Sequence, residues 1–85
     1  QIKQGMIVKS AAGHDKGSYY VVVKAQKDFV FIADGRRRKC SKPKKKSNKH
    51  VYCTAQTFEL DLVDTDKKIR RVLHTLNNDV SSVAE

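Results

Sequence analysis

The apolar residues of the chain fall into two parts that differ in their spacing. In the first part they form three short runs, at residues 6–9, 19–25 and 29–33, and the last two runs are rich in valine and aromatic residues. Short runs of this composition predict β-strands. A weaker run at residues 51–54 predicts a closing strand. The N-terminal part of the chain is therefore expected to be β structure.

The second part has helical spacing. From about residue 66 the apolar side chains recur at intervals of three and four, which places one set on a single helix face: Ile69, Val72, Leu73 and Leu76. The pair Asn77-Asn78 is a suitable helix end, so we predict a helix over about 66–77 and a polar, frayed tail from Asp79. The apolar face can cover one end of a β-barrel or bind a partner, and the first use is the simpler one.

Glycine and aspartate residues separate the predicted strands. Residues 11–18 contain two glycines and an aspartate, a composition typical of a loop with positive-φ positions. Asp34-Gly35 is a favoured two-residue hairpin turn, so we predict that residues 36–40 return as a strand antiparallel to residues 29–33. The register of this hairpin stays open, because either choice of core face places basic side chains on the core side.

Positive charge is concentrated between the strands and the helix. The chain has 18 Lys and Arg against 9 Asp and Glu, a formal net charge of +9. Residues 1–35 contribute +2, residues 36–50 contribute +9 and residues 51–85 contribute −2. Residues 41–50 have no apolar side chain except one proline, so we predict a mobile basic loop there. Such a run is typical of a surface that binds nucleic-acid phosphates, although a solvated loop has the same composition.

Length and composition exclude several classes of protein. The 85 residues fit one domain with a small core. The longest apolar run, Tyr19 to Val23, is far shorter than the roughly 20 residues that span a bilayer, and no segment resembles a signal peptide. Cys40 and Cys53 are too few for a disulfide framework, and their spacing from His50 matches no common zinc pattern. We expect reduced thiols, no metal, no cofactor, no membrane and a cytoplasmic location.

The remaining chemistry-bearing residues do not form a catalytic set. His74 lies on the predicted helix, and the carboxylates before the helix have no histidine or cysteine partner at a useful spacing, so we do not expect an enzyme. Phe29 and Phe31 lie in a wholly apolar run and are predicted to be core. Tyr20 or Tyr52, facing solvent, would be better candidates for stacking on bases. Since aromatic residues do not interrupt the basic run, recognition of phosphate and shape is favoured over the reading of bases.

A wider combination of motifs resembles a known family. The segment Gly5-Met-Ile-Val-Lys-Ser-Ala-Ala-Gly-His-Asp-Lys-Gly17 is similar to the KOW motif of translation and transcription proteins. The Asp34-Gly35 turn, the basic residues after it and the Asn48-Lys-His50-Val end of the run extend the similarity over roughly residues 4–54. Together they resemble the KOW-domain large-subunit ribosomal proteins, namely the archaeal and eukaryotic-type ribosomal protein fourteen-e and its short bacterial RNA-binding relatives. The long basic extension of the eukaryotic members is missing, which favours the short bacterial type.

The resemblance implies a mainly β fold, a small SH3-like β-barrel (KOW) with one C-terminal α-helix. The barrel would comprise residues 1–54 and include a basic loop at 36–50, and residues 55–85 would supply a linker, the helix and the tail. The implied function is binding of ribosomal RNA, as a component of the large ribosomal subunit or as a factor associated with it. The alternative is a non-ribosomal nucleic-acid-binding regulator, that is, a transcription or translation factor or a DNA-binding protein.

The predicted RNA contacts lie on the glycine loop and in the basic run. Asn48 is expected to shape the loop or to contact RNA, and His50 either packs at the strand end or contacts RNA. The full set is His14, Lys16, Arg36, Arg37, Arg38, Lys39, Lys42, Lys44, Lys45, Lys46, Asn48, Lys49 and His50. We expect the free protein to be a monomer whose helix contacts neighbouring ribosomal proteins.

Overall fold

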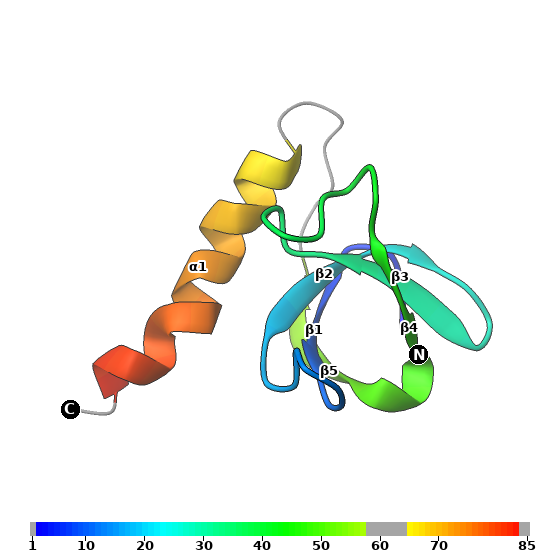
Figure 1. Ribbon diagram of the computed structural model, residues 1–85, viewed down its shortest axis with the longest axis horizontal. Helices are drawn as coiled ribbons and strands as arrows, with labels where there is room; N and C mark the ends of the chain where they lie inside the picture. The colour runs from blue at the N-terminus through cyan, green and yellow to red at the C-terminus, as the bar shows by residue number, and fades with distance from the viewer. Residues whose placement is uncertain (1, 58–64, 84–85) are drawn as a thin grey trace.

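A computed structural model describes residues 2–57 and 65–83 (Figure 1). Its strands are β1 (Met6–Ser10), β2 (Tyr19–Ala25), β3 (Phe29–Ala33), β4 (Lys44–Ser47) and β5 (Val51–Thr57). They form one antiparallel sheet in the order β4-β3-β2-β1-β5, which curls around a central core (Figure 1). A short 3₁₀ helix, η1 (Asn48–His50), joins β4 to β5, and the helix α1 spans Thr65–Val83. The fold is mainly β and consistent with a small SH3-like barrel, as predicted.

The three strong apolar runs form strands at their predicted positions. β2 and β3 coincide with residues 19–25 and 29–33, and β1 extends one residue beyond the prediction. The closing strand β5 is real and continues to Thr57, because its pairing with β1 supplies hydrogen bonds along most of its length. Apolar periodicity therefore located these strands correctly.

The predicted tight hairpin at Asp34-Gly35 is wrong. The Asp34 Oδ1 atom accepts hydrogen bonds from the backbone N–H groups of Arg36 and Arg38, at 2.9 and 3.0 Å. The Arg38 carbonyl in turn accepts from the N–H groups of Asp34 and Gly35. Because these bonds close a compact turn over residues 34–38, the chain does not return as a strand there.

The strand that pairs with β3 comes later, inside the predicted mobile loop. β4 lies antiparallel to β3, with Val30 opposite Lys46 and Phe31 opposite Lys45. Residues 41–50 are thus not a free loop, because four of them form this strand and three form η1. The all-polar composition hid the strand, since periodicity arguments need apolar side chains to mark a face.

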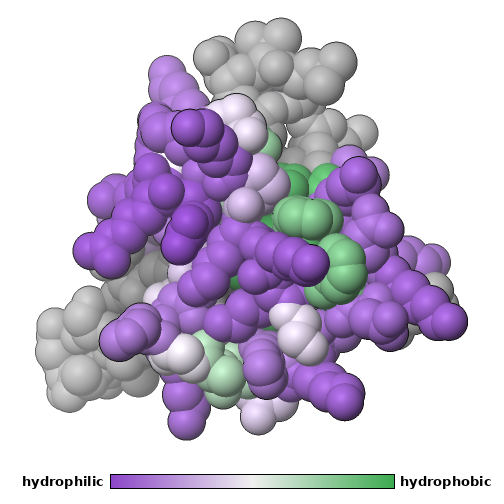
Figure 2. Space-filling model, turned by 45° about the vertical axis from the view of Figure 1, so that its right-hand side comes forward, coloured by the Kyte–Doolittle hydropathy of each residue, from purple (hydrophilic) through white to green (hydrophobic). Residues whose placement is uncertain are grey.

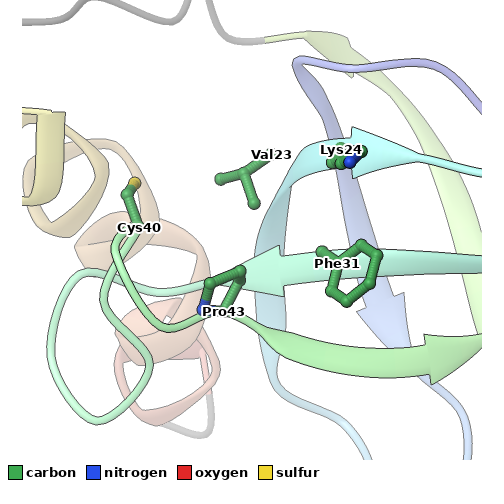
Figure 3. Close-up of a pocket in the computed structure, with 5 residues that line it drawn as sticks. All are labelled: Val23, Lys24, Phe31, Cys40 and Pro43. Carbon is green, nitrogen blue, oxygen red and sulfur yellow. The ribbon is translucent and has the colours of Figure 1, made fainter.

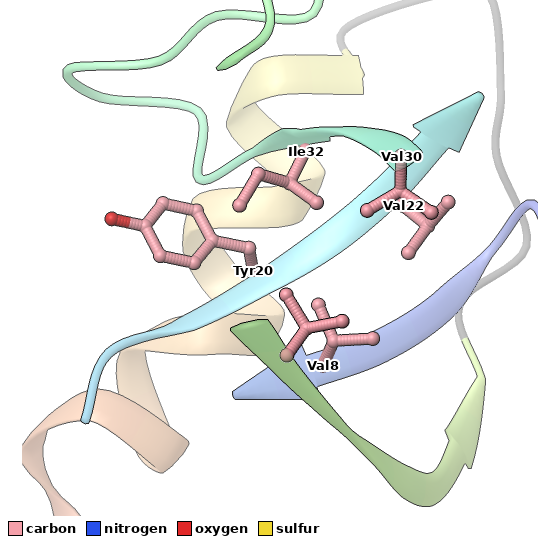
Figure 4. Close-up of a cluster of buried hydrophobic side chains, with 6 residues drawn as sticks. Val8, Tyr20, Val22, Val30 and Ile32 are labelled. Atoms are coloured by element: carbon pink, nitrogen blue, oxygen red, sulfur yellow. The ribbon is translucent and has the colours of Figure 1, made fainter. Parts of the chain in front are cut away.

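The inner face of the curled sheet holds the main core (Figure 4). Its buried members come from four strands: Val8, Tyr20, Val22, Val30, Ile32 and Val51. Side chains alternate between the two faces of a strand, so burial of Val30 and Ile32 directs Phe29 and Phe31 outward. Both phenylalanines are only half-buried, and the prediction that they are core residues is wrong.

A second cluster joins the helix to the outer face of the sheet. Ile69 and Leu73 of α1 are fully buried against Ile7 of β1 and Val21 of β2. Val72 and Leu76 pack at the edge of the same cluster, so the four predicted helix positions share one buried face. The helix covers the outer face of the sheet, however, and not an end of the barrel.

The helix is longer than predicted. It continues through Asn77-Asn78 and through the predicted frayed tail as far as Val83. Residues 77–83 contain no proline or glycine, and asparagine inside a helix costs only a fraction of a kcal/mol, on the order of 0.7, relative to alanine. Among the described residues, no helix is long and apolar enough to cross a membrane.

Candidate nucleic-acid interface

The glycine loop between β1 and β2 is fixed by one carboxylate. Gly13 and Gly17 have φ angles of 87° and 93°, the left-handed region in which glycine is at ease. Between them, Asp15 accepts hydrogen bonds from the Ser10 hydroxyl at 2.8 Å and from the ammonium groups of Lys44 and Lys46, both at 2.9 Å. The loop is therefore joined to β4, about thirty residues later in the sequence.

This carboxylate is held in its ionised form. Burial by itself would raise the pKa of Asp15, but the hydrogen bonds from Lys44, Lys46 and Ser10 outweigh burial and hold that pKa well below its usual value. Lys46 also donates to the Ala12 carbonyl at 2.7 Å, and only 8% of its side chain is exposed. A buried charge of this kind is tolerated because it is paired and hydrogen-bonded.

Two predicted RNA contacts are thereby occupied within the protein. Lys44 and Lys46 lie opposite Ile32 and Val30 in the register of β4 with β3, so their side chains belong to the inner face of the sheet. Lys46 is buried and Lys44 is half-buried, and the ammonium group of each forms an ion pair with Asp15. The structure does not support either as a phosphate contact, because their charges are already partnered.

The cations that precede β4 differ in this respect. Residues 36–42, which we call the basic turn, carry five exposed cations: Arg36, Arg37, Arg38, Lys39 and Lys42. Within the described part of the chain, they form no ion pair. Much of the surface in Figure 2 is hydrophilic, with a small hydrophobic patch within it. The basic turn thus presents five cations at the surface.

The backbone of the basic turn is fastened to the start of α1. The Arg70 guanidinium donates to the Gly35 carbonyl at 2.7 Å, and the Asp66 carboxylate accepts from the Cys40 N–H at 2.8 Å. Gly35 has a φ of +79°, and a Cβ there would collide with the Asp66 carbonyl and lie 2.9 Å from Arg70 Cγ. Only glycine both adopts this φ readily and leaves room for Asp66 and Arg70. The Asp34-Gly35 motif therefore allows the helix to pack against the turn, and it does not form a tight hairpin.

The glycine loop and η1 place the other predicted residues. His14 and Lys16 are exposed on either side of Asp15, and Lys49 is exposed on η1. Asn48 donates from its side chain to the Lys27 carbonyl at 3.0 Å, which fits the loop-shaping role predicted for it. 

His50 also lies on η1. Its side chain is exposed, and its carbonyl accepts from the Ala11 N–H, which ties η1 to the glycine loop. The exposure favours the contact alternative for His50 over the packing alternative.

The outer face of β3 and β4 carries an aromatic feature that sequence reasoning missed. The Phe29 and Phe31 rings meet edge to face, with centroids 5.8 Å apart. The Lys45 ammonium lies 4.0 Å from the centroid of the Phe29 ring, a cation–π contact, and Lys45 itself is exposed. The strict alternation of phenylalanine with valine and isoleucine in residues 29–32 was the available signal.

A pocket of about 370 Å³ opens on this outer face (Figure 3). Two strands and the end of the connection to β4 line it: Val23, Lys24, Phe31, Cys40 and Pro43. Burial and the nearby Asp66 carboxylate raise the pKa of the Cys40 thiol to about 11. The Cys40 side chain therefore lines the pocket as an uncharged thiol near pH 7. 

The two tyrosines that were candidates for stacking on bases, Tyr20 and Tyr52, differ in their exposure. Tyr20 is buried, and burial together with the Asp15 and Asp34 carboxylates raises its pKa to about 12. It cannot face solvent as a stacking residue. Tyr52 on β5 is 66% exposed, in agreement with the other half of that prediction. Among the described residues, no group of three or more His, Cys, Asp or Glu side chains could hold a metal ion.

No family model matches the chain, and no curated protein matches its sequence.

Proposed function

We propose that the protein binds RNA through the basic turn together with the glycine loop. The observation that carries this proposal is the basic turn itself, five exposed cations that form no ion pair with any described residue, on a backbone segment anchored to α1. Cations in this state can replace the counterions of a phosphate backbone, and the release of those counterions favours binding.

Anchoring of the backbone lowers the entropy that is lost when these cations bind a ligand. The Asp34 side chain closes the turn, and the contacts of Gly35 and Cys40 with α1 hold its two ends. A flexible segment would lose conformational entropy when it binds, whereas a backbone that is already ordered loses less. Only the exposed side chains then need to become ordered on RNA.

The glycine loop supplies a second contact region. Asp15 is turned toward Lys44 and Lys46, which neutralises its charge and leaves the exposed His14 and Lys16 to face a ligand. Lys45 and Lys49 add exposed cations on β4 and η1. The proposed surface is therefore the predicted set without Lys44 and Lys46, with Asn48 acting through the shape of the loop.

The resemblance to KOW-domain large-subunit ribosomal proteins makes ribosomal RNA the preferred ligand within this proposal. In that case the protein is a component of the large subunit or a factor that associates with it in the cytoplasm. A contact with neighbouring ribosomal proteins would use the outward face of α1, because Ile69 and Leu73 are buried on the sheet. The second candidate, a non-ribosomal regulator, needs only the basic surface and differs in its ligand.

The direct test is charge removal from the basic turn. A variant with Arg36, Arg37, Arg38 and Lys39 all replaced by glutamine should bind large-subunit ribosomal RNA about a hundredfold more weakly near 0.1 M salt. The slope of log affinity against log salt should fall by about three, since each lost phosphate contact removes roughly 0.7 to 0.9. Fluorescence anisotropy between about 50 and 200 mM KCl measures both quantities.

The control variant removes charge elsewhere. Replacing the exposed Lys67 and Arg71 of α1 by glutamine should leave affinity within about twofold. Equal losses in both variants would refute the assignment to the basic turn. Tighter binding to duplex DNA than to RNA would favour the second candidate, and failure to sediment with large subunits would exclude stable ribosome membership.

A further inference from the structure

The pocket on the outer face of β2 and β3 has a lining suited to one chemistry. Val23 and Pro43 form apolar walls, Phe31 supplies an aromatic ring, and Lys24 brings a cation to the rim (Figure 3). Its volume of about 370 Å³ falls within the usual range of small-ligand sites. An aromatic ring beside a lysine is suited to a planar group that carries a nearby negative charge.

Phe31 is not required to fill the core. Val30 and Ile32, on either side of it in β3, are fully buried on the inner face, while Phe31 is half-buried on the outer face. The edge-to-face contact with Phe29 restrains the Phe31 ring, and the Lys45 ammonium lies over the Phe29 ring. A restrained aromatic ring is a stacking surface that loses little entropy when a ligand arrives.

The pocket and the basic turn are parts of one surface. Cys40 and Pro43 line the pocket, and Lys39 and Lys42 lie directly beside them in the chain, exposed and without an ion pair to any described residue. A strand whose phosphates meet these lysines would bring its bases to the mouth of the pocket. None of the five lining residues is acidic, and the nearby Asp66 carboxylate already accepts a hydrogen bond from the Cys40 N–H.

We propose that this pocket receives one unpaired RNA base, which stacks on Phe31 while Lys24 and Lys42 contact the flanking phosphates. The inference rests on the proposed function and deepens it. The protein then recognises a bulged or unpaired nucleotide beside a helix, in addition to the phosphate backbone. The positive rim favours this ligand over an apolar peptide or a second copy of the same basic chain.

The test compares three RNA hairpins of the same stem: one with a single bulged adenosine, one with an abasic nucleotide at the bulge, and one fully paired. Wild-type protein should bind the bulged hairpin about tenfold more tightly than the abasic one, as expected for one stacked base. Phe31→Leu keeps an apolar side chain and should remove this preference. The dependence on salt should stay unchanged, because the basic turn is intact.

Tyr52→Leu is the matched control, since Tyr52 is an exposed aromatic residue outside the pocket. It should retain the tenfold preference. A second readout uses the absence of tryptophan from the chain: Phe31→Trp introduces a single tryptophan, which can be excited selectively at wavelengths longer than those that the tyrosines absorb. The bulged hairpin should quench its fluorescence and the abasic hairpin should not. Tyr52→Trp should respond to neither.

Each outcome separates the two proposals. Salt-dependent binding with no preference for the bulged hairpin refutes the pocket and leaves the proposed function standing. A preference that Tyr52→Leu abolishes and Phe31→Leu retains places base stacking on β5 and refutes the pocket as well. Absence of binding to all three hairpins and to ribosomal RNA refutes the proposed function. Self-association in sedimentation equilibrium that Phe31→Leu abolishes would show that a second copy occupies the pocket.

Discussion

The basic turn and the strand β4 carry a similar density of positive charge but use it differently. The basic turn has five cations in residues 36–42, all of them exposed, and β4 has three lysines in four residues. Two of those three reach Asp15 on the inner side of the sheet, and only Lys45 is exposed. Charge density along a sequence therefore does not give the charge that is available to a ligand.

The difference comes from what each segment pairs with. β4 forms a ladder with β3, so alternate side chains must point inward, where a buried lysine requires a carboxylate. The basic turn is closed by the Asp34 side chain and does not join the sheet, so none of its five cationic side chains is forced inside. Two of the three cations of one segment pair inside the barrel, and those of the other remain exposed at the surface. Four predictions test this division.

The largest effect is expected at the anchor of the basic turn. In Gly35→Ala the new methyl group would collide with the Asp66 carbonyl, at a φ of +79° that alanine rarely adopts. Together these should lower the free energy of unfolding by about 3 kcal/mol, measured by urea denaturation. Gly17→Ala is the control, because Gly17 has a similar φ but nothing within 4 Å. It should cost only about 1 kcal/mol, and equal losses would show that packing against α1 contributes nothing.

The next largest effect is expected at the carboxylate that β4 requires. Asp15→Asn leaves the buried Lys46 ammonium without its counter-charge, and should lower the free energy of unfolding by about 2 kcal/mol near pH 7. The asparagine still accepts a hydrogen bond and Lys44 is partly exposed, so the loss is smaller than for complete removal of a buried pair. Replacing the exposed Asp28 by asparagine should change stability by less than about 0.5 kcal/mol.

The difference in stability between the wild type and Asp15→Asn depends on pH. The pKa of Asp15 is lower in the folded protein than its usual value of 3.8, so its stabilisation is complete above that value and is lost as pH falls toward the folded-state pKa. The difference in stability between wild type and Asp15→Asn should therefore shrink as pH decreases below about 4. Denaturation at a series of pH values measures this, and a constant difference would contradict the assigned pairing.

The smallest effect compares two lysines that are two residues apart. Lys42→Gln removes an exposed cation of the basic turn, and should weaken RNA binding a few-fold and reduce the salt slope by about 0.9. Lys44→Gln removes a cation that is paired with Asp15, and should leave both quantities nearly unchanged. Anisotropy titrations against the same ribosomal RNA measure both variants. A larger loss for Lys44→Gln would reverse the division between the two segments.

The sequence predicted most of the fold because most of the fold has an apolar signature. β2, β3 and the buried face of α1 followed from the spacing of valine, phenylalanine, isoleucine and leucine alone. β4 has no such signature, because a strand of lysines resembles a loop until its partner strand and Asp15 are known. The Asp34-Gly35 pair has the composition of a turn, but its contact with Arg70 of α1, 35 residues away, was not accessible from local geometry.

For the candidate site, the exposed residues of the basic turn and the glycine loop followed from composition. Two outcomes that the sequence did not predict have the same origin. Lys44 and Lys46 pair with Asp15, and Phe29 and Phe31 lie outside the core, because the face on which a strand residue lies depends on its register. The neighbours of β3 determine that register, and the sequence of β3 is almost equally apolar at every position.

The sequence by itself thus determined the type of most elements and the concentration of positive charge in residues 36–50. These depend on local propensity and composition, which each residue carries wherever the chain places it. Only the tertiary structure decided which lysines are neutralised, which aromatic rings remain outside and what Gly35 contacts. Those outcomes depend on contacts between residues far apart in the chain, and they divide one run of positive charge into a part that pairs with Asp15 and a part that remains exposed.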